Sequence, residues 1–188
     1  MSIRVSIDAS GGDFGFSVTI NAGISALKTY DDLLINFVGD EAGIKNELNK
    51  NSSYSNFADR IDVTHASEVI NMSDSPSVAL RHKKDSSMRV AINLVKNGDA
   101  DACVSAGNTG ALMSIARFVL KTIKGVDRPA IMSAVPTLTG PTHVLDLGAN
   151  IDSRPSTLLQ FAIMGSIAVQ NTENIENPSV GLLNVGSE

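Results

Sequence analysis

The sequence predicts an α/β fold, a three-layer, doubly wound and mostly parallel sheet. Two observations lead to this prediction. Short apolar segments of strand length alternate with longer segments of helical periodicity, which is the order of βαβ units. The segment "LLINFVG" (33–39) is almost continuously apolar, as expected for a strand that helices cover on both faces. We therefore expect a parallel sheet between two helical layers.

The first third of the chain sets this alternation. Residues 3–8 ("IRVSID") have a strand pattern, and the glycine-rich "DASGGDFG" after them predicts a tight loop. Ser17 is the expected N-cap of a helix that runs to about Thr29 with a rough apolar stripe. The elements expected next are a strand at 33–39, a helix at 41–50, a loop at 51–55 and a strand at 61–64.

The rest of the chain continues the alternation. Pro76 in "SDSPS" predicts a break followed by a new helix start. A helix from Ser86 has one apolar face, and Gly98 is its natural stop. The further expected strands are 101–105, 130–136, 143–148 and 180–185, and the further expected helices are 110–120 and about 156–169.

Composition limits the class of protein. The chain has 188 residues, 43% of them hydrophobic, which predicts an ordinary folded globule. The net charge of −5 argues against nucleic acid as a partner, because phosphate-backbone binding needs a basic surface. Cys103 is the only cysteine, so an intrachain disulfide is impossible and a reducing compartment is indicated. With no signal-peptide pattern and no long apolar run, we expect a soluble, cytoplasmic protein.

Three polar, glycine-rich stretches directly follow expected strands: "DASGGD", "SAGNTG" and "DLGAN". Ligands of open parallel sheets bind beyond the carboxyl ends of the strands, so we expect these loops to converge on one crevice. The chain ends with "VGLLNVGSE", a strand and a glycine turn with no helix after them. We therefore expect residues 1–188 to form the N-terminal part of one α/β fold whose C-terminal part is absent.

The stretch "SAGNTGALMS" predicts an anion site. Asn108 or Thr109 is the expected cap of a helix whose first-turn N–H groups and positive dipole end favour an oxyanion. The alternative is a well-capped helix after a tight turn. The candidate substrate-binding residues in this stretch are Ser105, Gly107, Asn108, Thr109 and Gly110.

The first loop and the basic run are weaker signals. "DASGGDFG" lacks the dinucleotide-binding pattern, and Asp8 either contacts substrate or caps its own loop. "RHKKDSSMR" is either a solvated helix face or an anion site. The candidate substrate-binding residues in these two stretches are Asp8, Gly11, Gly12, Asp13, Lys83, Lys84 and Arg89.

The stretch "DLGANIDSRP" brings polar groups to another strand end. Asn150, with the backbone of Gly148 and Ala149, is placed to support a developing oxyanion. A structural turn capped by Asp152 is the alternative. We name Asn150, Asp146 and His82 as catalytic candidates. His65 and His143 have no companions at ligand spacing, so we expect no metal site and no cofactor, and Cys103 is expected to be a small core residue.

Seven motifs together resemble one known family. They are "DASGGD", "SMRVAINLV", "DACVSAGNTGALM", "DRPAI", "VLDLGAN", "LLQFAIMGS" and "NPSVGLLNVG". In this order they resemble the bacterial acyl-acyl-carrier-protein:phosphate acyltransferases, the PlsX family. The resemblance runs over almost the whole chain. Two departures are Ser10, where the family commonly has Met, and Ser153, where it commonly has Cys, so no catalytic thiol is expected at position 153.

The resemblance implies a fold like that of isocitrate and isopropylmalate dehydrogenases. It implies an enzyme of phospholipid synthesis that moves a fatty acyl group from acyl carrier protein to inorganic phosphate. The implied enzyme is a homodimer, loosely associated with the membrane, whose product feeds a glycerol-3-phosphate acyltransferase. On this reading the Ser105–Gly110 turn cradles phosphate or the phosphopantetheine arm, and Lys83, Lys84 or Arg89 offsets charge.

Two alternatives remain at this point. A phosphotransacetylase-like enzyme acting on acyl-coenzyme A would use similar loops. A non-catalytic piece would instead use the basic run at 81–84 to dock the acidic carrier protein. A nicotinamide-dependent dehydrogenase is disfavoured, because its metal-binding aspartates and arginine set are not found.

Overall fold

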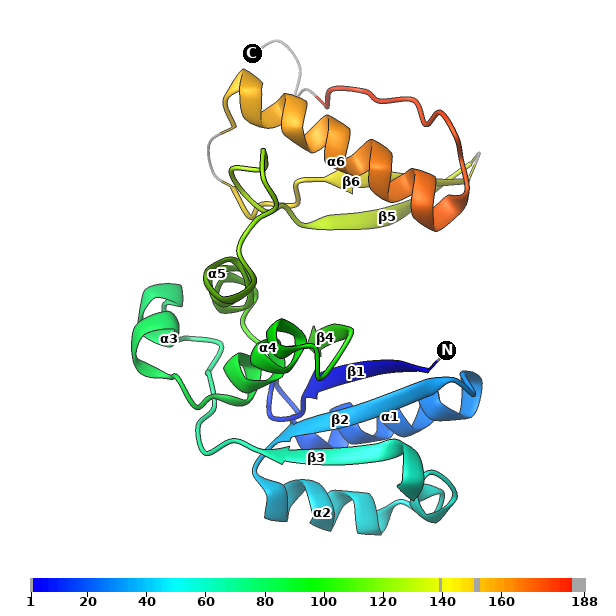
Figure 1. Cartoon of the computed structure of the whole chain (residues 1–188), viewed down its shortest axis with the longest axis vertical. Coiled ribbons are helices and arrows are strands. Elements are labelled where there is room, and N and C mark those ends of the chain that lie inside the picture. Colours follow the sequence, from blue (N-terminus) through cyan, green and yellow to red (C-terminus); the bar gives the residue numbers. More distant parts are fainter. Residues whose placement is uncertain (1, 139, 151–152, 184–188) are drawn as a thin grey trace. The chain divides into compact units, whose positions relative to one another are not determined.

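The computed structural model describes residues 2–138, 140–150 and 153–183. The chain forms two compact units, Met1–Lys121 (unit 1) and Thr122–Glu188 (unit 2), and each is described by itself (Figure 1).

Unit 1 is built on a four-stranded parallel sheet. Its strands are β1 (Ile3–Asp8), β2 (Leu33–Gly39), β3 (Ile61–His65) and β4 (Ala102–Ser105). Their order is β3-β2-β1-β4, so β1 lies between β2 and β4. The predicted α/β fold with a parallel sheet is confirmed in this unit.

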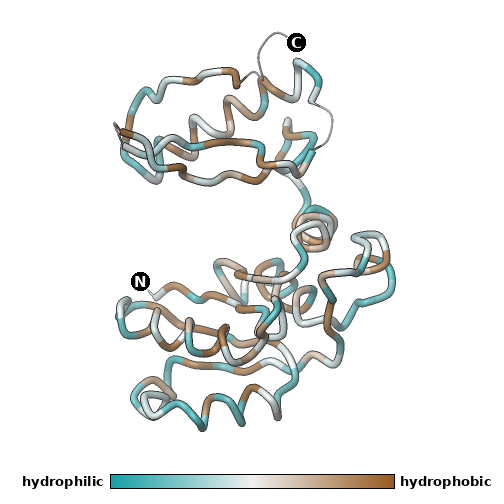
Figure 2. Tube along the Cα trace, turned by 180° about the vertical axis from the view of Figure 1, so that it is seen from behind, coloured by the Kyte–Doolittle hydropathy of each residue, from teal (hydrophilic) through white to brown (hydrophobic). Residues whose placement is uncertain are grey.

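Helices cover both faces of this sheet. α1 (Phe16–Thr29) and α2 (Glu41–Lys50) pack against one face, where Phe37 of β2 is fully buried among their apolar side chains. The neighbouring Val38 points to the opposite face and packs with Ala91 of α4 (Ser87–Asn97). α2 is mostly hydrophilic with a few hydrophobic positions (Figure 2), and its buried side chains, Ile44 and Leu48, lie one turn apart, as expected for a helix with one covered side. Two short 3₁₀ turns, Tyr54–Asn56 and Ala58–Arg60, lie between α2 and β3.

A second buried cluster holds the remaining helices of unit 1 together. α3 (Pro76–His82) and α5 (Thr109–Leu120) contribute Ala79 and Ile115, which pack with Met88 and Ile92 of α4. The expected helix boundaries are confirmed at two points. Ser75 caps α3 with Pro76 in its first turn, and Gly98 ends α4 in the left-handed conformation at φ 82°.

The start of α1 differs from the prediction. Gly15, at φ 50°, precedes the helix, and Ser17 lies inside its first turn. The Ser17 hydroxyl donates to the carbonyl of Phe14 at 2.9 Å instead of accepting from the helix. The capping prediction was wrong because the glycine, which tolerates positive φ, makes the turn that a serine cap was expected to make.

The described part of unit 2 contains an antiparallel pair of strands and one long helix. β5 (Met132–Thr137) pairs with β6 (Gly140–Leu145), and α6 (Pro155–Glu173) follows. Both strands lie close to those expected at 130–136 and 143–148, and they run antiparallel, because the connection between them is too short for a crossover helix. Residues 180–183 are not a strand, and the rest of the strand expected at 180–185 lies outside the described residues.

Candidate functional site

The strand order of unit 1 places the expected ligand-binding position at the carboxyl ends of β1 and β4. From β1 the chain crosses to β2 and β3 on one side, and it later returns to β4 on the other side (Figure 1). Such a reversal of direction is where open α/β sheets bind ligands. Asp8 ends β1 and Ser105 ends β4, and the two are register partners. Two of the three predicted loops therefore meet at this point.

A short hydrogen-bond chain joins these two loops. The Gly107 N–H donates to the Ser105 hydroxyl oxygen at 3.1 Å, and that hydroxyl donates to Asp8 Oδ2 at 2.6 Å. Asp8 is only 2% exposed, and its Oδ1 has no hydrogen-bond partner among the described residues. Since the Ser105 proton is directed at Asp8, this hydroxyl presents no proton to an outside anion in this arrangement.

Glycine is required where the two loops touch. A side-chain carbon on Gly11 would lie 2.5 Å from Asp8 Oδ2 and 3.1 Å from the Gly107 nitrogen. Gly12 has φ 84°, and a carbon added to it would lie 3.1 Å from the Ala106 carbonyl. These glycines therefore allow the loops to pack against each other. Asp13, by contrast, is exposed at the outer side of its loop.

Asn108 is the N-cap of α5, as predicted. Its Oδ1 accepts from the Ala111 N–H at 3.0 Å. Its Nδ2 donates to the carbonyls of Met72 and Asp74 at 3.0 and 2.9 Å, so both ends of the buried amide are engaged within the protein.

The first-turn backbone of α5 keeps free donors. Thr109 and Gly110 are exposed, and within the described ranges their N–H groups have no acceptor. Both N–H groups precede the first intrahelical donor and stand at the positive end of the helix dipole. This is the part of the predicted anion site that is open for a ligand.

Sequence reasoning missed one supporting segment. Residues 71–74 receive the Asn108 amide, and Pro76 lies against Gly110, where an added carbon would come within 2.8 Å of its Cγ. The stretch "SDSPS" predicts a break and a new helix start but no contact with the site. Its polar side chains next to a proline gave no signal of a tertiary contact with a segment more than thirty residues away.

The basic run separates into different environments. Lys83 Nζ lies 2.6 Å from Asp74 Oδ2 and 2.6 Å from the Val69 carbonyl. The hydrogen bond from Lys83 lowers the pKa of the Asp74 carboxyl group. His82 and Lys84 are exposed, and no hydrogen bond or ion pair joins the side chain of either to another described residue. The Arg89 guanidinium lies over the ring of Phe118, 5.3 Å from its centre.

The third predicted loop, in unit 2, is held by its own carboxylate. Asp146 accepts from the N–H groups of Ile131 and Asn150 at 2.9 and 2.7 Å, and from Asn150 Nδ2 at 3.0 Å. Ala149 N–H also donates to it at 3.3 Å. Burial raises the pKa of Asp146, but these donors outweigh it and lower the pKa overall.

The amide groups predicted to face an oxyanion are therefore engaged in this structure. Asn150 Nδ2 also donates to the Pro129 carbonyl at 3.0 Å, while Gly148 is exposed at φ 84°. The catalytic roles of Asn150 and Asp146 stay predictions. Asp152, the alternative cap, lies outside the described residues.

Cys103 was expected to be a small core residue, and the structure has it partly buried at the edge of the core. It packs against two buried clusters, and burial raises the pKa of its thiol to about 11. A thiol with this pKa is protonated near neutral pH and is a poor nucleophile. Across the residues that the structure describes, no group of three or more His, Cys, Asp or Glu side chains is arranged to hold a metal ion. None of the described helices is long and apolar enough to cross a membrane.

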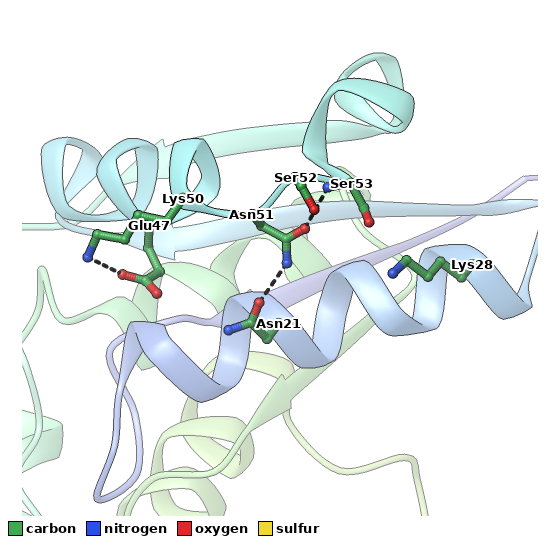
Figure 3. Close-up of a pocket in the computed structure, with 7 residues that line it drawn as sticks. All are labelled: Asn21, Lys28, Glu47, Lys50, Asn51, Ser52 and Ser53. Carbon is green, nitrogen blue, oxygen red and sulfur yellow. Dashed lines mark hydrogen bonds and ion pairs between the residues drawn. The ribbon is translucent and has the colours of Figure 1, made fainter.

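A polar hollow lies elsewhere on unit 1, between α1 and the end of α2 (Figure 3). Its side chains largely satisfy one another. Glu47 pairs with Lys50 at 2.8 Å, and Asn51 donates to Asn21 at 2.7 Å. It contains none of the predicted site residues. Its lining residues are Asn21, Lys28, Glu47, Lys50, Asn51, Ser52 and Ser53.

Comparison with known proteins places the chain in a family. Phosphate acyltransferases from Ruthia magnifica and Methylococcus capsulatus are 65% and 57% identical to it over 188 and 184 residues. Another, from Legionella pneumophila strain Paris, is 54% identical over 187 residues. The alignments cover 98–100% of this chain but only 54–55% of each relative, so the chain spans about half of their length. A family described as "Fatty acid synthesis protein" matches residues 3–188. The chain belongs to this family of fatty acid synthesis proteins.

Proposed function

We propose that the whole protein is a phosphate acyltransferase that makes acyl phosphate from acyl carrier protein thioester and inorganic phosphate. The observation that carries this proposal is the identity of 51–65% to relatives named phosphate acyltransferase, over essentially the entire chain. We further propose a dehydrogenase-like three-layer fold for the complete enzyme. A homodimer, a loose association with the membrane and transfer of the product to a glycerol-3-phosphate acyltransferase belong to the same proposal.

The reaction needs no covalent intermediate with the protein. A phosphate oxygen attacks the thioester carbonyl carbon, the new C–O bond forms, and the C–S bond breaks. The thiolate leaves and takes up a proton, which is easy because a thiol has a pKa of about 8.5. The protein has to hold a phosphate dianion against the carbonyl and stabilise the developing oxyanion.

Within unit 1, the first turn of α5 is the proposed phosphate site. The free N–H groups of Thr109 and Gly110 are the donors, and the Asp8–Ser105 hydrogen bond fixes the loop from which they project. Asn108 contributes indirectly, because its side chain caps α5 and anchors residues 71–74. The Asn150 amide donates to Asp146 and Pro129 in this structure. To stabilise an oxyanion, it has to give up one of these hydrogen bonds and donate to the substrate instead.

The test removes one backbone donor and leaves the fold intact. Thr109 is the first residue of α5, a position that favours proline, and Asn108 before it has the extended ψ of 110° that proline requires. Thr109→Pro in the full-length enzyme deletes only that N–H from the first turn. A charge-assisted hydrogen bond contributes about 1.5–3 kcal/mol, so KM for phosphate should rise about 10-fold to 100-fold.

Thr109→Ala is the matched control, because it loses the same side chain but keeps the N–H. Acyl phosphate formation from acyl carrier protein is measured for both variants. If Thr109→Pro and Thr109→Ala have the same KM for phosphate, the α5 terminus is not the phosphate site. If the unmodified enzyme uses acyl-coenzyme A but not acyl carrier protein, the phosphotransacetylase-like function replaces the proposed one.

A further inference from the structure

The charge of unit 1 is divided between its two parts. Residues 1–74 contain five basic and eleven acidic residues, a net charge of −6. Residues 75–121 contain seven basic and three acidic residues, a net charge of +4. This second part consists of α3, α4, β4 and α5. An acidic protein therefore presents a locally basic surface over three neighbouring helices.

Two basic side chains of this part share one aromatic ring, and others lie in the last turn of α3 and in the segment after it. Residues 83–86 alone link the end of α3 to the start of α4, and Arg89 in the first turn of α4 stacks on Phe118 near the end of α5. Lys121 Nζ lies 4.8 Å from the centre of the same ring. We call this surface the basic corner; it comprises Arg81, Lys84, Arg89, Phe118 and Lys121.

Three carboxylates lie against the segment that joins α3 to α4, so the basic residues outnumber the acidic ones there but are partly offset by them. Asp74 pairs with Lys83 at 2.6 Å, and Glu68 Oε2 accepts from the Asp85 N–H at 2.9 Å. The Asp85 carboxylate accepts from the N–H and hydroxyl of Ser67 at 2.9 and 2.5 Å. Asp101 lies beyond the opposite end of α4 and accepts from the Arg4 N–H at 2.8 Å. Asp99 follows Gly98 at that same far end.

Phe118 gives the basic corner an apolar centre. The side chain is 53% exposed although two cations stack on its ring. An exposed aromatic ring surrounded by long cationic side chains is a typical anchor of a protein interface, and it favours an acidic partner.

The basic corner and the phosphate site lie at opposite ends of one helix. Thr109 and Gly110 begin α5, and Phe118 lies near its end. A helix of 12 residues is about 18 Å long, so a thioester carried by a partner docked at the corner has to cross about this distance to reach the site. A long flexible arm on the partner would span it.

We infer that the basic corner docks an acidic carrier protein, which delivers its thioester to the start of α5 on its prosthetic arm. This inference rests on the proposed function and assigns the partner's docking surface. An anionic lipid surface would also be attracted to these cations, but it has no arm that reaches the site.

The experiment reverses two charges of the corner that lie outside the proposed phosphate site. Arg81→Glu/Lys121→Glu in the full-length protein should weaken the binding of holo acyl carrier protein about tenfold, measured by calorimetry. The salt dependence of binding should become shallower at the same time. The matched control is Lys28→Glu/Lys96→Glu, which has the same charge change in the last turns of α1 and α4 and should bind within about twofold of the unmodified protein.

Each outcome decides the inference. Equal weakening by both double variants, or by neither, overturns it. Loss of binding to phosphatidylglycerol vesicles with unchanged carrier binding also overturns it and makes the corner a lipid surface. Because calorimetry needs no turnover, carrier binding at the corner without acyl phosphate formation would leave the docking surface standing and remove the proposed function.

Discussion

Two serines of unit 1 have buried hydroxyl groups, but only one of these groups makes hydrogen bonds within the described part of the chain. Ser6 is fully buried in β1, and its hydroxyl donates to the carbonyls of Ala91 and Ala102 at 2.9 and 3.2 Å. The Ser10 hydroxyl is also buried but has no partner among the described residues. A buried hydroxyl without a partner keeps its desolvation cost and gains nothing in return.

Alanine at the two positions should therefore act in opposite directions. Ser6→Ala should lower the free energy of unfolding by about 1 kcal/mol, because two contacts to α4 and β4 are lost. Ser10→Ala should be neutral or raise the free energy of unfolding by up to about 1 kcal/mol. Urea denaturation followed by circular dichroism measures both, each serving as the control for the other. A larger loss for Ser10→Ala than for Ser6→Ala would mean that Ser10 has a partner in solution.

At the scale of elements, short-range signals in the sequence located the helices of unit 1 well. Asn108 caps α5 as predicted, and α3 and α4 begin where Pro76 and Ser86 predicted a helix start. Local capping chemistry depends on residues three positions apart, which a sequence shows directly. The partners of Asn108 and Lys83 outside their own helices depend on tertiary packing, which has no comparable local signal.

The directions of β5 and β6 show the same limit. Both were expected as strands, but the sequence between them does not show whether the second runs with or against the first. The catalytic candidates Asp146 and Asn150 were likewise named from their position after a strand. That position also suits a carboxylate that holds its own loop, and the structure has Asp146 accepting from that loop.

Two helical glycines differ in whether a side chain would fit at their positions. A side-chain carbon on Gly23 of α1 would lie 2.6 Å from Cζ of the fully buried Phe37. On Gly165 of α6 it would meet only Leu145 Cδ1, at an ordinary 3.9 Å. The first glycine permits helix and sheet to pack closely, whereas the second only costs backbone entropy.

Gly23→Ala should thus destabilise α1 by about 1–3 kcal/mol through overpacking. Gly165→Ala should stabilise α6 by about 0.5–1 kcal/mol, the usual difference in helix propensity. Hydrogen exchange of the α1 and α6 amides reports each helix separately. Faster exchange of the α6 amides in Gly165→Ala would contradict the prediction, since it would mean that the added methyl group has no room.

At the scale of the molecule, the apolar core is unevenly distributed. Among the described residues, the three buried hydrophobic clusters consist of unit 1 residues. In the described part of unit 2, Phe161 is the one buried hydrophobic side chain, at 4% exposure. Several large apolar side chains of this unit are instead exposed, among them Leu138, Leu159, Ile163, Leu182 and Leu183.

This distribution predicts that unit 1 folds by itself and that unit 2 does not. Residues 1–121, expressed alone, should unfold cooperatively, because the complete four-stranded sheet and all three clusters lie within them. Residues 122–188 should show no cooperative transition, since so short a segment with one buried aromatic ring cannot offset the entropy of ordering its backbone. Thermal melts followed by circular dichroism, with the 188-residue chain as the reference, measure both. A sharp, two-state melt of residues 122–188 would show that this unit buries more apolar surface than its described side chains do, and a gradual melt of residues 1–121 would mean that its sheet depends on the rest of the chain.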